Sequence, residues 1–413
     1  MLEQDNNKIQ TNKGSLLTKT TTVLFIVFIV GVLVYTAYQD FFSQGASKDF
    51  PTTTELKEIF SNGYLYLVVG FSCLFIGFLF KGLKNVVMCK LLTNKAHFKT
   101  SMETAIIGTY YNNVTPLAVG GQPFEIYHLS KHGVHGGVAS AIPIVSFFVN
   151  QISFVILTIV GIVLLKSGVI VAPDSMQGGL STFFLLGIIG CFFCIFVPSL
   201  VVLFCIFPKL CAKLVYIVIK IGAKLKILTN PNKTLNKTLK TVIHNSMCMK
   251  QIASNLPSFI TLFILSFLEN FANTSICFFV LKGFGMDIGG LSFFSEWILV
   301  IMLCAIIMAS ITFVPTPGNS GAADLSFFAL FSSVLPSGLC FPAMLTWRLF
   351  SFYATLLVGF LLTTIKKRAD IKYFKAHTEH TNASIEDAFK EIKLPESFNF
   401  VIEKQNTTTD NNG

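Results

Sequence analysis

Seven stretches of the chain are apolar at nearly every position, and polar or charged segments separate them. A helix needs about 20 apolar residues to cross roughly 30 Å of hydrocarbon, and each stretch reaches or approaches that length. The pattern therefore predicts seven membrane-spanning helices, at residues 20–38, 64–82, 138–168, 183–207, 257–281, 292–313 and 341–365.

Proline and glycine interrupt the apolar sequence in two places, and the two breaks resemble each other. The first runs from Thr115 to Glu125 and the second from Pro315 to Asp324; each has Thr-Pro, then glycines, then one carboxylate. Proline removes a backbone N–H and glycine loosens a helix, so each break leaves polar backbone that lipid cannot satisfy. Such a break survives only where it lines a cavity, and a matched pair of breaks indicates a transporter's binding site.

The composition and the placement of lysine set the class and the orientation of the protein. Hydrophobic residues make up 53% of the chain, charged residues 13%, and the mean hydropathy is +0.67, which excludes an ordinary soluble domain. Lysines gather at 81–99, at 209–250 and after the last span, whereas the loop between the first two spans is acidic. The positive-inside rule therefore predicts a multi-pass cell-membrane protein with both termini cytoplasmic.

Seven full crossings would leave the C-terminus on the wrong side, so one more crossing or its equivalent is needed. We expect 292–313 to enter from outside and stop at the second break, and 318–335 to return as a half-helix. Around the first break, 101–112 and 124–135 form a hairpin that enters from the cytoplasm. The predicted fold is an all-α polytopic membrane protein with about seven full spans plus two re-entrant hairpins related as an inverted repeat.

The segment Asn112–Leu129, the break Pro315–Gly321 and Arg348 together resemble the transmembrane region of the lysylphosphatidylglycerol synthase family, also called the flippase-like domain. The resemblance covers about residues 20–365. It implies that the chain moves an anionic or aminoacylated phospholipid, such as lysyl-phosphatidylglycerol, between leaflets. A phosphatidylglycerol lysyltransferase is the alternative, as is a membrane partner of a lipid-modifying enzyme or glycosyltransferase.

In full-length relatives a separate C-terminal domain makes the lipid from aminoacyl-tRNA. Only about 45 residues follow the last predicted span, which is fewer than an independent domain usually needs. The resemblance therefore implies the translocase rather than the synthase. We expect three parts: a cytoplasmic segment 1–19, the transmembrane domain 20–365 and a polar, largely disordered tail 366–413.

Arg348 is the most conspicuous charge within a span. The chain has only two arginines, Arg348 and Arg368, among 31 basic residues. A guanidinium binds phosphate in a bidentate manner, so Arg348 is a candidate ligand for the lipid phosphate. A structural ion pair, with Glu269 as the partner, is the equally weighted alternative.

Glu269 belongs to a polar stripe on its predicted helix. Ser266, Glu269, Asn270 and Asn273 fall at i, i+3, i+4 and i+7, and therefore share one face. Such a stripe either holds helices together or lines a water-accessible path. The carboxylate at mid-depth favours the path.

Glu125 and Asp324 follow the glycines of the two breaks, near the predicted starts of the returning half-helices. Each carboxylate could cap free N–H groups. Alternatively, each could bind an ammonium head group while the glycine N–H groups bind phosphate. Capping is favoured for Asp324, and both interpretations stay open for Glu125. The predicted substrate site comprises Arg348, Glu269, Asn273, Thr115, Gly120, Gly121, Glu125, Thr316, Gly318, Gly321 and Asp324.

The basic segment 209–250 begins as an amphipathic helix that carries Lys209, Lys213, Lys220 and Lys224 on one side. These lysines act as topology determinants or attract anionic lipid. Because the positive charge is spread over loops that flank spans, nucleic acid is not an expected partner. The expected partners are a phospholipid substrate, the membrane, and either a second copy of the chain or a lipid-modifying enzyme.

The remaining polar residues predict no catalytic site, metal or cofactor. The cysteines are scattered in or beside spans, and no nucleotide-binding motif is present, so transport would follow a gradient, protons or the membrane potential. His128, His132 and His135 are interpreted as interfacial groups rather than ligands, with proton coupling left open.

Overall fold

The computed structural model describes residues 61, 63–115, 120–134, 136–224, 231–336 and 338–369. Within these ranges the chain is helical, with no strand. Six helices are long and apolar enough to cross a membrane, and they confirm six of the seven predicted spans. They are Tyr64–Thr93, Gly136–Lys166, Leu180–Leu203, Leu256–Gly283, Phe293–Ser310 and Cys340–Thr364. The predicted span 20–38, the N-terminal segment and nearly all of the tail lie outside the described residues.

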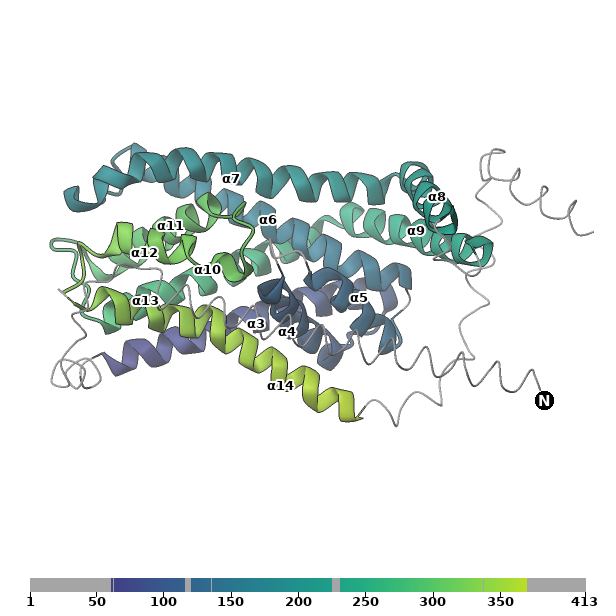
Figure 1. The fold of residues 1–413 in the computed structure, drawn as a ribbon, viewed down its shortest axis with the longest axis horizontal. Coiled ribbons are helices and arrows are strands. Elements are labelled where there is room, and N and C mark those ends of the chain that lie inside the picture. The colour runs from purple at the N-terminus through teal and green to yellow at the C-terminus, as the bar shows by residue number, and fades with distance from the viewer. Residues whose placement is uncertain are drawn as a thin grey trace, which may run out of the picture.

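The long helices lie side by side along one axis (Figure 1). They are α3 (Tyr64–Thr93), α6 (Gly136–Lys166), α7 (Asp174–Ile206) and α10 (Leu256–Gly283). Along much of their length α3 and α10 are packed together. Small residues allow this approach: a Cβ on Gly77 would lie 2.5 Å from Asn273 Oδ1.

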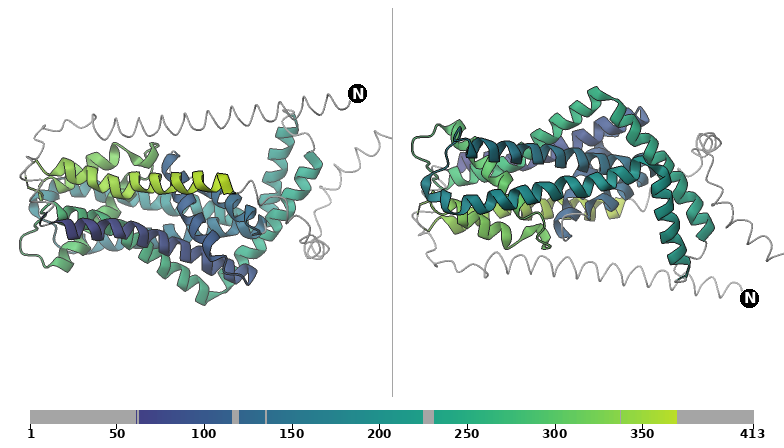
Figure 2. Two further views of the ribbon diagram at one scale, coloured as in Figure 1. Left: turned by 90° about the horizontal axis from the view of Figure 1, so that it is seen from below. Right: turned by 90° about the horizontal axis from the view of Figure 1, so that it is seen from above.

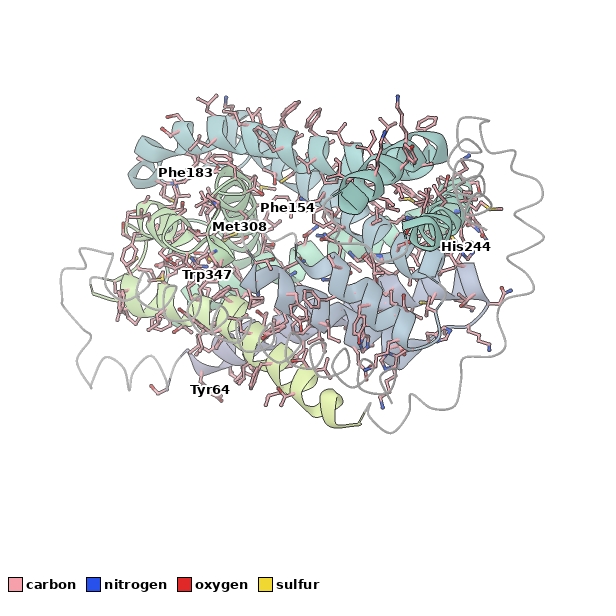
Figure 3. The ribbon with its side chains drawn as sticks, turned by 45° about the vertical axis from the view of Figure 1, so that its right-hand side comes forward. Tyr64, Phe154, Phe183, His244, Met308 and Trp347 are labelled. Carbon is pink, nitrogen blue, oxygen red and sulfur yellow. The ribbon has the colours of Figure 1, made fainter. Side chains whose placement is uncertain are left out.

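The outer surface of the bundle is apolar. Figure 3 shows side chains rich in carbon projecting outward from α7. Val163, Leu185 and Phe192 are all more than half exposed. A soluble domain would not leave so many large apolar side chains in water, so this surface suits lipid. The largest buried apolar cluster joins α3, α7, α10, α11 and the C-terminal helices.

The first hairpin consists of α4 (Phe98–Val114) and α5 (Gly121–Lys131). It forms as predicted, but α5 begins three residues earlier than expected. The reason is local: Thr115 Oγ1 accepts a hydrogen bond from Gly120 N at 2.9 Å, and Asn112 Oδ1 accepts one from Gly121 N at 2.7 Å. These side chains satisfy N–H groups at the start of α5, so the helix can begin at the glycines.

The second hairpin consists of α11 (Phe293–Ser310), a short 3₁₀ turn η2 (Pro317–Asn319) and α12 (Ala322–Phe331). Its returning half-helix is shorter than the predicted 318–335. The tip is left-handed, with φ of +60° at Gly318, +52° at Asn319 and +82° at Gly321. This conformation favours glycine and asparagine, which explains the residues at the tip.

The hairpins approach each other from opposite ends of the bundle. Figure 1 places α4 and α5 toward the end where α8 and α9 lie, and α11 and α12 toward the other end. The turn η2 of the second hairpin packs against α4 of the first. The two breaks are therefore neighbours within the bundle, as the sequence predicts.

The last span has three parts: α13 (Cys340–Arg348), a π-helical turn η3 (Leu349–Tyr353) and α14 (Ala354–Ala369). A π-helical turn widens a helix and often occurs at functional sites. Phe352 in this turn packs with Tyr110 and Val114 of α4. The turn therefore lies beside the tip of the first hairpin.

Two further helices, α8 (Pro208–Lys224) and α9 (Pro231–Ser254), cover one end of the bundle. Figure 2 shows α8 crossing this end at a steep angle to the long helices. The structure confirms the amphipathic helix expected at the start of 209–250. Lys213 and Lys220 are exposed, as are Val218 and Ile221.

Candidate functional site

A polar cavity of about 140 Å³ lies where α3, α4 and α10 meet the last span. This volume is well above what one water molecule needs, so the cavity has room for several waters. Its lining combines two charged residues with polar and apolar ones: Lys81, Glu269, Thr109, Asn113, Asn273, Ser351, Thr355, Leu74, Gly77, Phe78 and Ile276. Polar groups of this number within membrane-spanning helices mark a functional site by default.

Lys81 is the cation of the cavity. Its Nζ lies 3.3 Å from Glu125 Oε1 and donates a hydrogen bond to Thr109 Oγ1 at 3.0 Å. The Lys81 side chain is 15% exposed and that of Glu125 is 6% exposed. Glu125 therefore pairs with a cavity-lining lysine and does not cap α5.

A second lysine–glutamate pair lies deeper in the bundle. Lys84 Nζ is 2.6 Å from Glu269 Oε2 and donates to Asn150 Oδ1 at 3.3 Å. Lys84 is almost completely buried, so its ammonium depends on these partners. Because Glu269 also lines the cavity, two lysines and two glutamates form a neutral group in and beside it.

The polar stripe of α10 has both of the roles considered for it: part of it contacts a neighbouring helix, and part of it lines the cavity. Asn270 Nδ2 donates to Asn150 O at 3.2 Å and to Ser153 Oγ at 3.4 Å, so Asn270 holds α10 against α6. Glu269 and Asn273 line the cavity. The stripe is therefore helix contact at one edge and cavity wall at the other.

The proposed ion pair between Arg348 and Glu269 is wrong. Arg348 Nε donates to Asp324 Oδ1 at 2.6 Å, and Arg348 Nη1 donates to Gly318 O at 2.9 Å. Arg348 and Asp324 are nearly inaccessible to solvent. The predicted ion pair of Arg348 exists, but its partner is Asp324, because Glu269 is paired with Lys84. Arg348 thus fixes the tip of the second hairpin, and phosphate binding by it stays a prediction.

The expected capping role of Asp324 is confirmed. Its Oδ2 accepts a hydrogen bond from the N–H of Gly321, the residue that precedes α12, at 2.8 Å. With the other oxygen on Arg348, this carboxylate holds the break and the last span together. It does not line the cavity.

Three of the four glycine N–H groups expected to bind phosphate have acceptors within the protein. Gly120 N donates to Thr115 Oγ1, Gly121 N to Asn112 Oδ1, and Gly321 N to Asp324 Oδ2. Thr316 Oγ1 donates to Ser320 O at 3.1 Å. The threonines and glycines of the breaks therefore shape the two tips, and the cavity-lining side chains lie beside them.

Comparison with known proteins sets these features in a family. The profile of the family "Lysylphosphatidylglycerol synthase TM region" matches residues 28–359. The chain belongs to this family. It is also similar to a UPF0104 membrane protein of Archaeoglobus fulgidus, with 22% identity over 302 residues, or 72% of this chain and 85% of the relative. The match to the lysylphosphatidylglycerol synthase transmembrane region includes both hairpins and every cavity-lining residue.

The sequence did not lead us to Lys81 and Lys84 as residues of the candidate site. Both were counted with the lysines of 81–99 that set the orientation, because the span was expected to end at residue 82. The structure continues α3 to Thr93, so both lysines lie within the bundle. Their spacing of three residues, which places them near one helix face, was the available signal.

A larger apolar groove, of about 570 Å³, lies between α6 and α7. It is lined by residues such as Ile159, Phe192 and Phe196, and only Ser199 and Cys191 interrupt its apolar wall. The groove opens on the apolar outer face and has no charged group. It suits an acyl chain, whereas the cavity at Lys81 suits a polar head group.

Proposed function

We propose that the protein is a lipid translocase that moves an anionic or aminoacylated phospholipid between leaflets, with the head group passing through the cavity at Lys81 and Glu269. The observation that carries the proposal is the pair of lysine–glutamate contacts at a membrane-embedded polar cavity. Membership of the lysylphosphatidylglycerol synthase transmembrane family supports the same substrate class.

The chemistry of these pairs fits such a head group. A phosphate can take the place of Glu125 at Lys81, and the ammonium of an aminoacyl group can take the place of Lys84 at Glu269. Each exchange replaces one ion pair by another, and the displaced Glu125 and Lys84 carry opposite charges, so the net charge of the group stays balanced. Lys81 is the natural entry point because it is the more exposed of the two lysines.

The resting cavity is too small for a whole aminoacylated head group, so transport requires it to widen. The elements around it allow this. Gly120 and Gly121 lie at the start of α5, and the last span carries the π-helical turn Leu349–Tyr353. Glycines and π-helical turns are places where helices change shape at low cost.

Leaflet exchange in proteoliposomes tests the proposal. The full chain is reconstituted, and the appearance of labelled phosphatidylglycerol or lysyl-phosphatidylglycerol in the opposite leaflet is followed. We expect Lys81→Met to lower the exchange rate at least about tenfold, which corresponds to about 1.4 kcal/mol. The variant leaves Glu125 without its ion pair, so gel filtration and helical circular dichroism first establish that it is folded.

Lys282→Met is the matched control. Lys282 Nζ lies 2.6 Å from Glu296 Oε2 with an 18% exposed side chain, so this pair resembles Lys81–Glu125 but lies away from the cavity. Its loss should leave the exchange rate unchanged. Equal rates in wild type and Lys81→Met, or absence of exchange of both lipids by the folded wild type, would contradict the proposal.

A further inference from the structure

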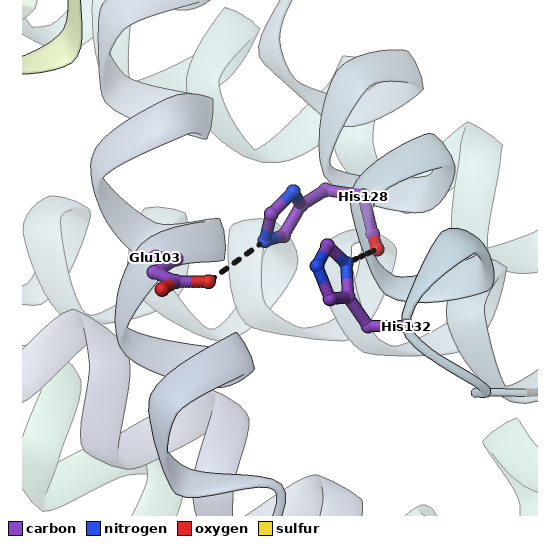
Figure 4. Close-up of side chains that lie close together, drawn as sticks. All are labelled: Glu103, His128 and His132. Atoms are coloured by element: carbon purple, nitrogen blue, oxygen red, sulfur yellow. Dashed lines mark hydrogen bonds and ion pairs between the residues drawn. The ribbon is translucent and has the colours of Figure 1, made fainter. Parts of the chain in front are cut away.

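Three potential metal ligands gather in the first hairpin, apart from the cavity. Glu103 comes from α4, His128 from α5, and His132 from the residue that ends α5. One ligand atom from each lies within 4.8 Å of the others. Figure 4 shows the three side chains converging between the two helices. His128 is buried within the protein, and its position at the membrane interface stays a prediction.

The hydrogen bond of His132 sets its ring for ligation. His132 Nδ1 lies 2.7 Å from His128 O, and a carbonyl oxygen can only accept, so Nδ1 carries the proton. The other nitrogen, Nε2, is then the one with a lone pair in the neutral ring. Figure 4 shows Nε2 on the side of the ring that faces Glu103. Metal-binding histidines commonly donate their second N–H to a backbone carbonyl in this way.

The spacing of the other two ligands fits a tetrahedral ion. His128 Nε2 lies 3.3 Å from Glu103 Oε2. Zn²⁺ binds imidazole nitrogen and carboxylate oxygen at about 2.0–2.1 Å, so two of its tetrahedral ligands stand about 3.3–3.4 Å apart. Only His132 has to move closer. Its i, i+4 relation to His128 at the end of a helix makes that a change of one side chain.

We infer that Glu103, His128 and His132 form a binding site for one divalent transition-metal ion of the zinc type, with a fourth position open to water. Two imidazoles and one carboxylate suit Zn²⁺ and its neighbours, whereas Mg²⁺ and Ca²⁺ prefer oxygen ligands alone. The ion would join α4 to the far end of α5. It would hold together the two arms of the hairpin whose tip lies beside the cavity.

The site is tested by titrating the metal-stripped full chain with Zn²⁺ in a calorimeter, using a purification tag without histidine. We expect one ion per chain. His132→Ala should weaken binding at least about tenfold, because loss of even an outer-shell partner costs 10–100-fold in metal affinity. His132 ends its helix and is only partly buried, so the variant should remain monodisperse in gel filtration.

Two further variants complete the test. Glu103→Gln keeps a hydrogen-bond acceptor for His128 but removes the carboxylate, and should weaken binding like His132→Ala. His97→Asn, at a left-handed position before α4 that asparagine tolerates, should bind Zn²⁺ as the wild type does. If the wild type binds no stoichiometric Zn²⁺, or if all three variants match it, the cluster is a hydrogen-bonded contact and the inference is overturned.

Discussion

The two hairpins place similar carboxylates in different surroundings. Asp324, in the second hairpin, is fully buried and accepts hydrogen bonds from Gly321 N and from Arg348 at 2.8 and 2.6 Å. Glu125, in the first hairpin, lies 3.3 Å from Lys81, which lines the cavity and is partly exposed. The breaks are alike in sequence, but the second carboxylate is held by its own hairpin and the last span.

This difference assigns distinct tasks to the two halves. A buried, charge-assisted contact with short bonds on both oxygens fixes a backbone tip in one conformation. A longer contact whose lysine is partly accessible from the cavity can be exchanged for a contact with a ligand at lower cost. We therefore regard the second hairpin as the fixed reference and the first as the substrate-facing element of the proposed translocase.

The largest expected effect comes from breaking the fixed pair. Asp324→Asn leaves the guanidinium of Arg348 buried without its counter-charge. Removing one partner of a buried ion pair destabilises a protein by about 3–5 kcal/mol. Part of this cost is offset because Arg348 also donates to Gly318 O. Unfolding in mixed micelles, followed by helical circular dichroism, measures the loss.

Glu125→Gln is the counterpart in the first hairpin. Its pair with Lys81 is longer, the Lys81 side chain is 15% exposed, and Lys81 keeps its hydrogen bond to Thr109, so the loss should cost about 1–3 kcal/mol, less than that of Asp324→Asn. Equal destabilisation by Asp324→Asn and Glu125→Gln would remove the distinction between a fixed and an exchangeable hairpin. The further change Arg348→Met in the Asp324→Asn background should recover part of the stability, because no charge then remains buried.

The features that sequence predicted here are local ones. Runs of apolar residues predicted the spans, Thr-Pro and glycine predicted the two breaks, and the position of Asp324 just after the glycines predicted the cap. Each depends on residues within a few helical turns, so its physics is contained in a short segment. The family resemblance, which rested partly on residues 112–129, was confirmed by the family profile that matches residues 28–359.

The ion pairing could not be predicted, because it depends on how distant helices pack. The sequence argument paired Arg348 with Glu269, and only the fold shows that Asp324 faces Arg348 while Glu269 faces Lys84. The end of α3 was misplaced for a related reason. Lysines normally mark the membrane surface, but here Lys81 and Lys84 are tolerated inside because two glutamates neutralise them.

A smaller but more specific effect is expected from Gly108→Ala. The Cβ of an alanine there would occupy the place of Glu125 Oε1, so the carboxylate must turn away from Lys81. We expect the exchange rate to change several-fold, while the free energy of unfolding falls by about 1–2 kcal/mol, as for modest overpacking. The proteoliposome assay and micelle unfolding report the two quantities separately.

Gly187→Ala is the matched control for this glycine. In α7 the added Cβ would meet Ile306 Cγ2 at 3.4 Å, an ordinary contact. Alanine in a helix interior is favoured over glycine by about 0.5–1 kcal/mol, so the control should be as stable as the wild type or slightly more so. A Gly108→Ala protein that exchanges lipid at the wild-type rate would show that the position of Glu125 does not matter for transport.

The smallest expected difference is the one between the threonines of the two breaks. Thr115 Oγ1 accepts from Gly120 N, so Thr115→Val leaves that N–H without its acceptor, at a cost of about 1–3 kcal/mol if it stays buried. Thr316 Oγ1 instead donates to Ser320 O, and Thr316→Val removes only a donor, for about 0.5–1.5 kcal/mol. Midpoints of thermal unfolding should therefore fall more for Thr115→Val. The reverse order would mean that the second tip depends on its threonine more than on Arg348 and Asp324, and the fixed hairpin would then need another explanation.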